Sequence, residues 1–187
     1  MATILKQLTS TPQPDGTTAT IANTGYASLT PGSGNTHVHA DAAKMGAGAG
    51  FRMTQAGATQ NIAYVDLDAN VDELDFRIEF KWAGTLTQNT TIGRAYSDVG
   101  HLTVLWSFLL TTTGRLQFLE TGTSPLNVTS PSTNGLNLFP GTEYVLMGQV
   151  NTVNKTLTLD CYIRTSTTKL FQLTGALVNT VAMRSFR

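Results

Sequence analysis

Three acidic residues in one short stretch are of the type that glycoside hydrolysis requires, so their spacing has to be examined. Glu73, Asp75 and Glu79 stand at alternate positions, so in an extended strand their side chains share one face. Glycosidases place two such carboxyl groups around the scissile bond. At about 3.3 Å per residue, Asp75 and Glu79 lie roughly 13 Å apart, which is too far for a retaining or an inverting pair. Glu73 and Asp75 could approach each other, but an exposed charge ladder with Arg77 explains these acids equally well.

A second acidic stretch resembles the start of a calcium-binding loop. Asp66, Asp68, Asn70 and Asp72 place side-chain oxygens at alternate positions, as a loop that closes on a hard cation requires. The match then fails, because valine replaces the loop glycine and Arg77 stands where the closing glutamate belongs. We therefore interpret the stretch as a solvated passage from strand to turn. Asp66, Asp68 and Asp72 stay candidate ligands for a calcium site of another design.

Two histidines and an aspartate form the other candidate metal site. His37, His39 and Asp41 alternate, so on a strand they would share a face, as imidazole and carboxylate ligands of a metal often do. The remaining histidine, His101, has no recognisable spacing to them. A polar loop or a strand paired with a neighbour explains the same residues, and a metal on the axis of a trimer is the alternative. We predict no cofactor, with Ca²⁺ left open.

Four aromatic residues could form a platform on which a sugar ring stacks. Trp82 continues an apolar strand face and Trp106 lies in a stretch that is apolar at nearly every position, so both are predicted in the core. Tyr96 and Tyr162 are the better candidates for an exposed face. The predicted ligand-binding residues are Tyr96, Asp160, Tyr162 and Arg164. Since the sequence has no phosphate-binding loop, nucleophile elbow or zinc-ligand spacing, we predict no catalytic residue.

The elements that must position these residues are β-strands, and the clearest is part of a hairpin within residues 136–164. Apolar and polar residues alternate without a break from Thr156 to Arg164, which predicts a half-buried strand. Tyr144–Val150 is its predicted antiparallel partner and Asn151–Lys155 the connecting loop. The apolar positions of the second strand are Leu157, Leu159, Cys161 and Ile163.

The remaining pattern predicts an all-β fold. Leu74–Trp82 alternates cleanly, and Leu102–Leu110 is apolar at nearly every position, which predicts a strand covered on both faces. No amphipathic helix is evident, so we predict a two-sheet antiparallel β-sandwich. The other predicted strands are Thr3–Leu8, Thr17–Ala22, Phe51–Gln55, Asn61–Leu67, Thr90–Tyr96, Arg115–Glu120, Leu126–Thr129, Lys169–Leu173 and Thr180–Phe186.

The density of bulky apolar residues divides the chain into an arm and a domain. Residues 1–50 contain few of them, which predicts an extended N-terminal arm with one or two strands. Residues 51–187 are predicted to form a single compact sandwich. The last predicted strand stops at Arg187, so we expect the native polypeptide to continue or this strand to pair at an edge.

Composition narrows the classes of partner. Charged residues make up 13% of the chain, against about 25% in typical domains, and the net charge is zero. This argues against nucleic acid or an anionic membrane as a partner held by bulk electrostatics. The single cysteine, Cys161, excludes an intrachain disulfide and is predicted in the core. The N-terminus lacks the apolar segment of a signal peptide, and no apolar run is long enough to predict a membrane span.

Three stretches together resemble the concanavalin A-like (lectin/glucanase, laminin-G-like) jelly rolls. The first is the aromatic-rich strand at residues 76–82, and the second is the apolar strand, turn and Gly-Arg-Leu-Gln-Phe strand at 102–118. The third is Pro-Gly-Thr-Glu-Tyr-Val-Leu-Met-Gly-Gln-Val at 140–150, followed by Thr-Leu-Thr-Leu-Asp-Cys-Tyr-Ile. The likeness covers about residues 50–187 and implies a jelly-roll fold.

The N-terminal stretch carries a second likeness. Asp-Gly-Thr-Thr-Ala-Thr-Ile-Ala-Asn-Thr-Gly-Tyr at 15–26 and Gly-Ser-Gly-Asn-Thr-His-Val-His-Ala-Asp at 32–41 are similar to the start of minor tail proteins of phages infecting actinobacteria. That resemblance implies a structural role in the virion, at the tail tip. We therefore expect a non-enzymatic protein that contacts other virion proteins, and we also expect a homo-oligomer such as a trimer. The first alternative is a carbohydrate-binding module that recognises host cell-wall glycan. The second is a glycoside hydrolase.

Overall fold

The computed structural model describes residues 17–18, 28–30, 36–39, 50–53, 62–82, 84–131 and 137–187, with side chains from residue 66 onward. The chain divides into two compact units, Met1–Asp68 with Arg187, and Ala69–Phe186. The sequence had placed this boundary near residue 50. Every regular element in the described ranges is a β-strand. No helix in this part of the chain has the length and hydropathy to cross a membrane.

Short paired strands characterise the first unit, for which the backbone is described. β1 (Thr17–Thr18), β3 (Thr36–His39) and β4 (Gly50–Met53) form an antiparallel sheet in the order β1-β3-β4. β2 (Ser28–Thr30) pairs antiparallel with β5 (Ile62–Val71). The predicted strand at Thr3–Leu8 lies outside the described residues.

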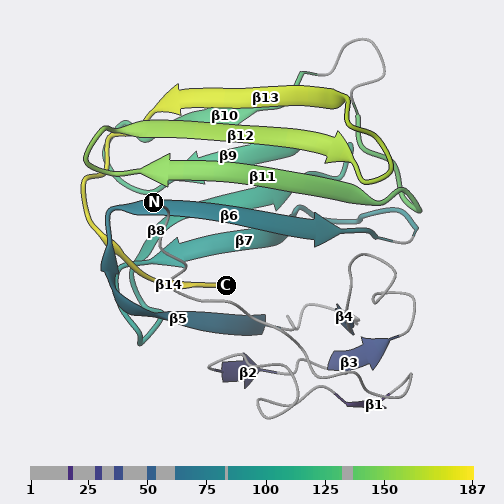
Figure 1. Cartoon of the computed structure of the whole chain (residues 1–187), viewed down its shortest axis with the longest axis horizontal. Coiled ribbons are helices and arrows are strands. Elements are labelled where there is room, and N and C mark those ends of the chain that lie inside the picture. The colour runs from purple at the N-terminus through teal and green to yellow at the C-terminus, as the bar shows by residue number, and fades with distance from the viewer. Residues whose placement is uncertain are drawn as a thin grey trace. The chain divides into compact units, whose positions relative to one another are not determined.

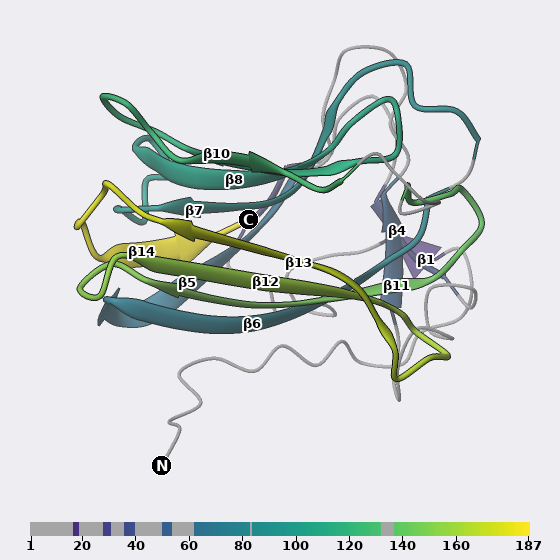
Figure 2. The same cartoon turned by 90° about the horizontal axis from the view of Figure 1, so that it is seen from above.

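The second unit is a sandwich of two antiparallel sheets. Its strands are β6 (Glu73–Phe80), β7 (Thr90–Tyr96), β8 (Val104–Leu110), β9 (Leu116–Glu120), β10 (Asn127–Thr129), β11 (Tyr144–Asn151), β12 (Thr156–Ile163), β13 (Lys169–Ala176) and β14 (Met183–Phe186). The four-stranded sheet has the order β13-β12-β11-β6 and lies in front in Figure 1. The strands β10-β9-β8-β7-β14 form the layer behind it, and Figure 2 shows the two layers edge-on.

The core between the sheets follows from the alternation of apolar residues. On β12, Leu159 and Cys161 are fully buried, as the sequence predicted. The aromatic ring of Phe76 on β6 packs across the sandwich, with centroids 5.1 Å from Phe108 and 6.2 Å from Trp106. Such ring pairs contribute about 0.5–1.5 kcal/mol beyond the area that they bury. The aromatic side chains therefore join the two sheets into one core.

Gly148 on β11 leaves the space that the ring of Phe76 occupies. A Cβ built at this glycine would lie 2.1 Å from Phe76 Cζ, which no real pair of atoms tolerates. The ring therefore lies directly over the β11 backbone. Gly175 on β13 serves Leu126 in the same way, with Leu126 Cδ2 2.4 Å from the built Cβ. A larger residue at either position would displace the side chain packed against it.

The all-β, two-sheet antiparallel sandwich predicted from the sequence is confirmed. β8 is largely covered on both faces, as predicted, since adjacent residues Leu105 and Trp106 are 2% and 1% exposed. It begins at Val104, however, and Leu102 lies in the preceding turn with 85% of its surface exposed. β5 extends beyond the predicted end at Leu67, through the acidic stretch to Val71. Apolar content alone therefore did not predict where β8 begins or where β5 ends.

Candidate functional site

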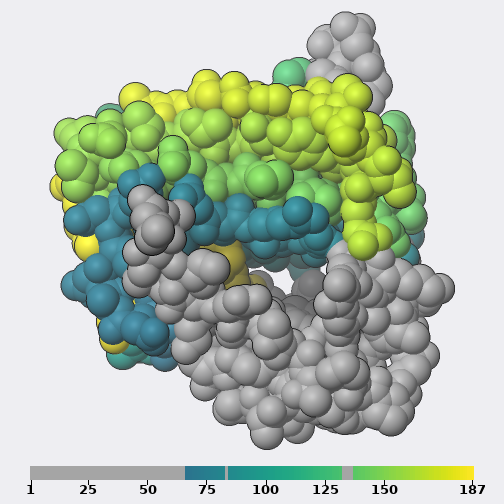
Figure 3. Space-filling model, viewed as in Figure 1, coloured from purple at the N-terminus to yellow at the C-terminus, as the bar shows by residue number. Residues whose placement is uncertain are grey.

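The exposed side of the four-stranded sheet, named here the outer face, unites polar residues from strands far apart in sequence. β11 pairs with β6 on one side and β12 on the other, so Glu79, Val145 and Tyr162 form one row across three strands. Figure 3 looks onto this face, with β13, β12 and β11 in yellow and green above β6 in blue. The outer face consists of Glu73, Asp75, Arg77, Glu79, Val145, Met147, Gln149, Asn151, Thr156, Thr158, Asp160, Tyr162, Lys169, Gln172, Thr174 and Ala176.

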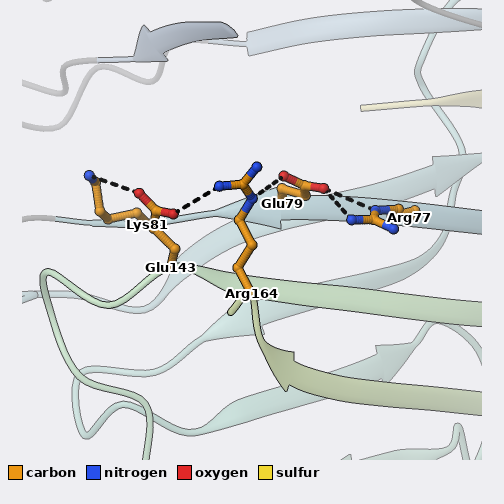
Figure 4. Close-up of polar contacts among 5 residues, drawn as sticks. All are labelled: Arg77, Glu79, Lys81, Glu143 and Arg164. Carbon is orange, nitrogen blue, oxygen red and sulfur yellow. Dashed lines mark hydrogen bonds and ion pairs between the residues drawn. The ribbon is translucent and has the colours of Figure 1, made fainter. Parts of the chain in front are cut away.

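A chain of alternating charges crosses one end of the four-stranded sheet (Figure 4). Arg77 Nε lies 3.0 Å from Glu79 Oε1, so the ion pair that the structure gives Arg77 is with Glu79 and not with Glu73 or Asp75. Glu79 Oε2 is 3.2 Å from Arg164 Nε, and Arg164 Nη1 is 3.4 Å from Glu143 Oε2. The second oxygen of Glu143 lies 3.5 Å from Lys81 Nζ. Arg164 therefore bridges two carboxylates, and its part in a ligand site stays a prediction.

Asp160 organises the middle of the outer face. Its Oδ1 accepts hydrogen bonds from Lys169 Nζ at 3.0 Å and from Gln172 Nε2 at 2.8 Å. Its Oδ2 accepts a longer bond, 3.4 Å, from the hydroxyl of Tyr162. Asp160 and Tyr162 therefore lie together on a half-exposed surface, as the alternation of β12 predicted. The two donors from β13 fix the carboxylate, and one of them, the Lys169 ammonium, also pairs its charge.

Glu73 and Asp75, the acids that could approach each other, are joined by an amide. Gln149 Nε2 donates to Glu73 Oε1 at 2.8 Å and to Asp75 Oδ1 at 3.1 Å. Asn151 Nδ2 donates to the other oxygen of Glu73 at 3.2 Å. Both acids lie on the exposed sheet surface. Glycoside hydrolysis stays the second alternative, to be tested by an assay of polysaccharide turnover.

Tyr96 lies in the interior, and its prediction as an exposed ligand-binding residue is wrong. It is 2% exposed, and its ring meets that of His101 edge-on with centroids 5.7 Å apart. The neighbouring Ala95 is fully buried as well, so the end of β7 is covered on both faces and alternation does not predict an exposed side there. Trp106 is core, as predicted. Trp82 follows the end of β6 and is half-buried, with its ring 5.9 Å from that of Tyr144.

The acidic stretch does not form a calcium-binding loop. Asp66 and Asp68 lie within β5, and Asp72 lies at the bend between β5 and β6. Side chains on one face of a strand stand about 6.6 Å apart, since the chain advances about 3.3 Å per residue. Their oxygens therefore do not converge along β5, whereas the oxygens of a calcium loop do. This corrects the likeness to a calcium loop.

The histidine pair lies in a paired strand. His37 and His39 belong to β3, where their backbones pair with Arg52 and Gly50 of β4, in agreement with the predicted strand pairing. Asp41 lies outside the described residues, so the metal site on these three residues stays a prediction. Among the residues whose side chains the structure describes, no three His, Cys, Asp or Glu side chains gather closely enough to hold a metal ion.

Sequence reasoning missed several residues that complete the outer face. Gln172 and Lys169 reach Asp160 from β13, and Gln149 bridges two acids from β11. The alternation of polar and apolar residues predicted which face of its strand each donor lies on. It did not predict which acid on a neighbouring strand the donor would reach. Comparisons with protein-family models, curated proteins and solved structures found no match. The geometry of the outer face therefore carries the functional argument.

Proposed function

We propose that this chain is a non-enzymatic structural protein of a phage virion, a minor tail or tail-tip protein whose lectin-like sandwich contacts other virion proteins. The observation that supports a contact role is the pairing of charges on and beside the outer face. In the described structure, the carboxylates of Glu79, Glu143 and Asp160 each already have a cationic or amide partner. A neighbouring protein that covers this surface would bury few uncompensated charges.

The pairing of charges lowers the desolvation cost of docking on such a face. Removing an unpaired charge from water costs several kcal/mol, whereas a paired and hydrogen-bonded charge keeps its partner when it is covered. Side chains already held by neighbours also lose less conformational freedom on binding. Met147 stands among the paired charges with 46% of its surface exposed, beside the buried Val145. An apolar centre within a polar surround is the usual anatomy of a protein–protein interface.

The test is incorporation of variants into particles. We expect Met147→Glu to lower incorporation of the full-length protein at least about tenfold, because the interface would have to bury an extra carboxylate. Val153→Glu is the matched control, since Val153 is 67% exposed in the turn after β11 and lies off the outer face. The amount of each variant in purified virions is measured by quantitative mass spectrometry. Equal incorporation of Met147→Glu and wild type would contradict the proposal, as would a particle map in which the outer face contacts nothing.

Binding of cell-wall glycan by the same face is the second candidate function. It is favoured by the half-exposed ring of Tyr162, which is flanked by the hydrogen-bonding group of Asp160. A sugar stacks its C–H face on such a ring and bonds its hydroxyls to the adjacent polar groups. On a glycan array we expect Tyr162→Ala to lose binding and Tyr162→Phe to keep most of it. Binding that survives Tyr162→Ala would exclude this surface as the glycan site.

A further inference from the structure

The four-stranded sheet ends in an open strand edge at β13. β13 is the last strand in the order β13-β12-β11-β6, and no strand in the described part of the chain pairs with its other side. Figure 1 shows β13 along the upper margin of the front sheet. An open edge presents a row of backbone N–H and C=O groups on which another strand can pair. The edge of β13 is therefore a candidate interaction surface that adjoins the outer face.

β13 is less protected against such pairing than the edges with which it can be compared. Charges, bulges and short length protect the open edges of natural sheets. β6, the opposite edge of this sheet, carries a charged residue at every second position from Glu73 to Glu79, and β10, an edge of the other sheet, is 3 residues long. β13 has Lys169 and a register shift at its beginning. Its remaining stretch, Phe171–Ala176, contains no charge and no proline and pairs with β12 in unbroken register.

Alternate residues of β13 direct their backbone groups at this open edge. Leu177 N–H donates to the carbonyl of Lys155 at 2.9 Å, one step beyond the last paired residues of β12 and β13. Bonded and non-bonded residue pairs alternate along an antiparallel ladder. Counted back in twos from Leu177, the residues between the bonded ones are Ala176, Thr174 and Gln172. Each of these therefore points its N–H and its C=O away from β12.

We propose that β13 pairs antiparallel with β13 of a second copy of this chain, with the Thr174 residues of the two copies opposite each other on a two-fold axis. In this register Gln172 of each copy lies opposite Ala176 of the other. Every backbone group that the three residues direct outward then gains a partner. A shift of the register toward Lys169 would instead set Ala176 or Thr174 opposite Leu170, where the regular pairing with β12 breaks.

A second copy is the partner that fits this edge because the strand is complementary to itself. Two threonines facing each other across an antiparallel pair form a favourable contact, whereas two like charges do not. Lys169, the charged residue of β13, is already paired with Asp160 of β12 at 3.0 Å. The net charge of the chain is zero, so two copies do not repel each other at long range. Because contacts of this kind are the same on both partners, they close into a dimer.

The first experiment measures the mass of the intact chain by sedimentation velocity from about 1 μM to about 1 mM. We expect a monomer–dimer equilibrium with a dissociation constant within that range, because an interface of one strand pair lies at the small end of the known sizes. Thr174→Pro should weaken the dimer at least about tenfold, since proline removes an N–H that only the second copy uses. A thermal melt of this variant checks that it is folded.

The second experiment tests the register by disulfide formation and does not depend on the proline variant. On the two-fold axis the Thr174 Cα atoms would lie about 5.5 Å apart, within the range of a disulfide, so Thr174→Cys should cross-link to itself under mild oxidation. Gln172→Cys is the matched control on the same strand and face. Its Cα atoms would be roughly 13 Å apart, so it should not cross-link. The native Cys161 is buried and does not compete.

Four results would overturn the proposal, which does not depend on the virion assignment. The first is a monomer at every concentration, and the second is a trimer or larger assembly in place of the dimer. The third is a folded Thr174→Pro variant that dimerises as tightly as wild type. The fourth is cross-linking of Gln172→Cys as fast as that of Thr174→Cys, which would indicate random collision or another register.

Discussion

Glu120 is a buried acid whose substitution should be among the most costly in the sandwich. It stands at the end of β9 and is 5% exposed. Its carboxylate accepts hydrogen bonds from the backbone N–H groups of Leu126 at 3.0 Å and Val178 at 2.9 Å, and from that of Asn179. The side chain thus ties the loop between β9 and β10 to the segment that follows β13. Three backbone donors that would otherwise lack a partner converge on one anion.

Glu120→Gln keeps the shape of this side chain and removes its charge. One of the two acceptor oxygens becomes an NH₂ group that faces backbone N–H donors, so at least one donor loses its partner. Hydrogen bonds to a charged group contribute about 1.5–3 kcal/mol each, and a buried donor without a partner costs about 1–3 kcal/mol. We therefore expect the free energy of unfolding to fall by roughly 3 kcal/mol. For a domain of this size the melting temperature should fall by roughly 10 °C.

The assay is urea unfolding followed by circular dichroism, with a thermal melt as the second measurement. Glu73→Gln is the matched control, because Glu73 lies on the exposed outer face and its loss should change stability by less than about 0.5 kcal/mol. The reasoning is refuted if Glu120→Gln unfolds within about 1 kcal/mol of wild type while the control behaves as expected. That outcome would mean that the backbone donors find other partners when the anion is lost.

Three further predictions concern the core and the loop after β7. Burial raises the pKa of Cys161 to about 12, so its thiol should resist iodoacetamide until the chain unfolds. The free energy of unfolding should fall between about pH 8.5, where the thiol of the unfolded chain ionises, and about pH 12. Urea titrations at several pH values should show a smaller fall in Cys161→Ala. Gly148→Ala should lower the free energy of unfolding in urea by about 1–3 kcal/mol, because the new Cβ meets the ring of Phe76. Adding Phe76→Leu should restore part of that free energy, whereas a double variant whose change is the sum of the two single changes would contradict the contact. Hydrogen bonds from the backbone N–H groups of Thr103 and Leu102 lower the pKa of Asp98, so its stabilisation should be present above about pH 4 and disappear as the pH falls further; an acid-unfolding curve unchanged in Asp98→Asn would refute this.

The candidate site was predictable strand by strand and not as a whole. Alternation along β12 placed Asp160 and Tyr162 on one exposed face, because in a strand the side-chain period is two whatever the neighbours are. The same rule failed at Tyr96, where both sides of the strand end are covered. The partners Gln172 and Gln149 depend on the pairing of β13 with β12 and of β11 with β6, and on the register of each pair. The pattern within one strand does not set these pairings by itself.

By itself the sequence determined that the chain is built of strands, which positions of β6 and β12 face a core, and that Cys161 belongs to that core. These follow from local steric preference and from the cost of exposing apolar surface, both of which act over a few neighbouring residues. Tertiary structure alone decided that the polar faces of β6 and β12 flank β11 on one surface. It also brought Trp82, Thr112 and Asn137 to one cavity. Both arrangements depend on contacts between residues that are distant in the chain. The free energy of these contacts is set by packing and hydrogen-bond geometry in three dimensions, and not by the identity of adjacent residues.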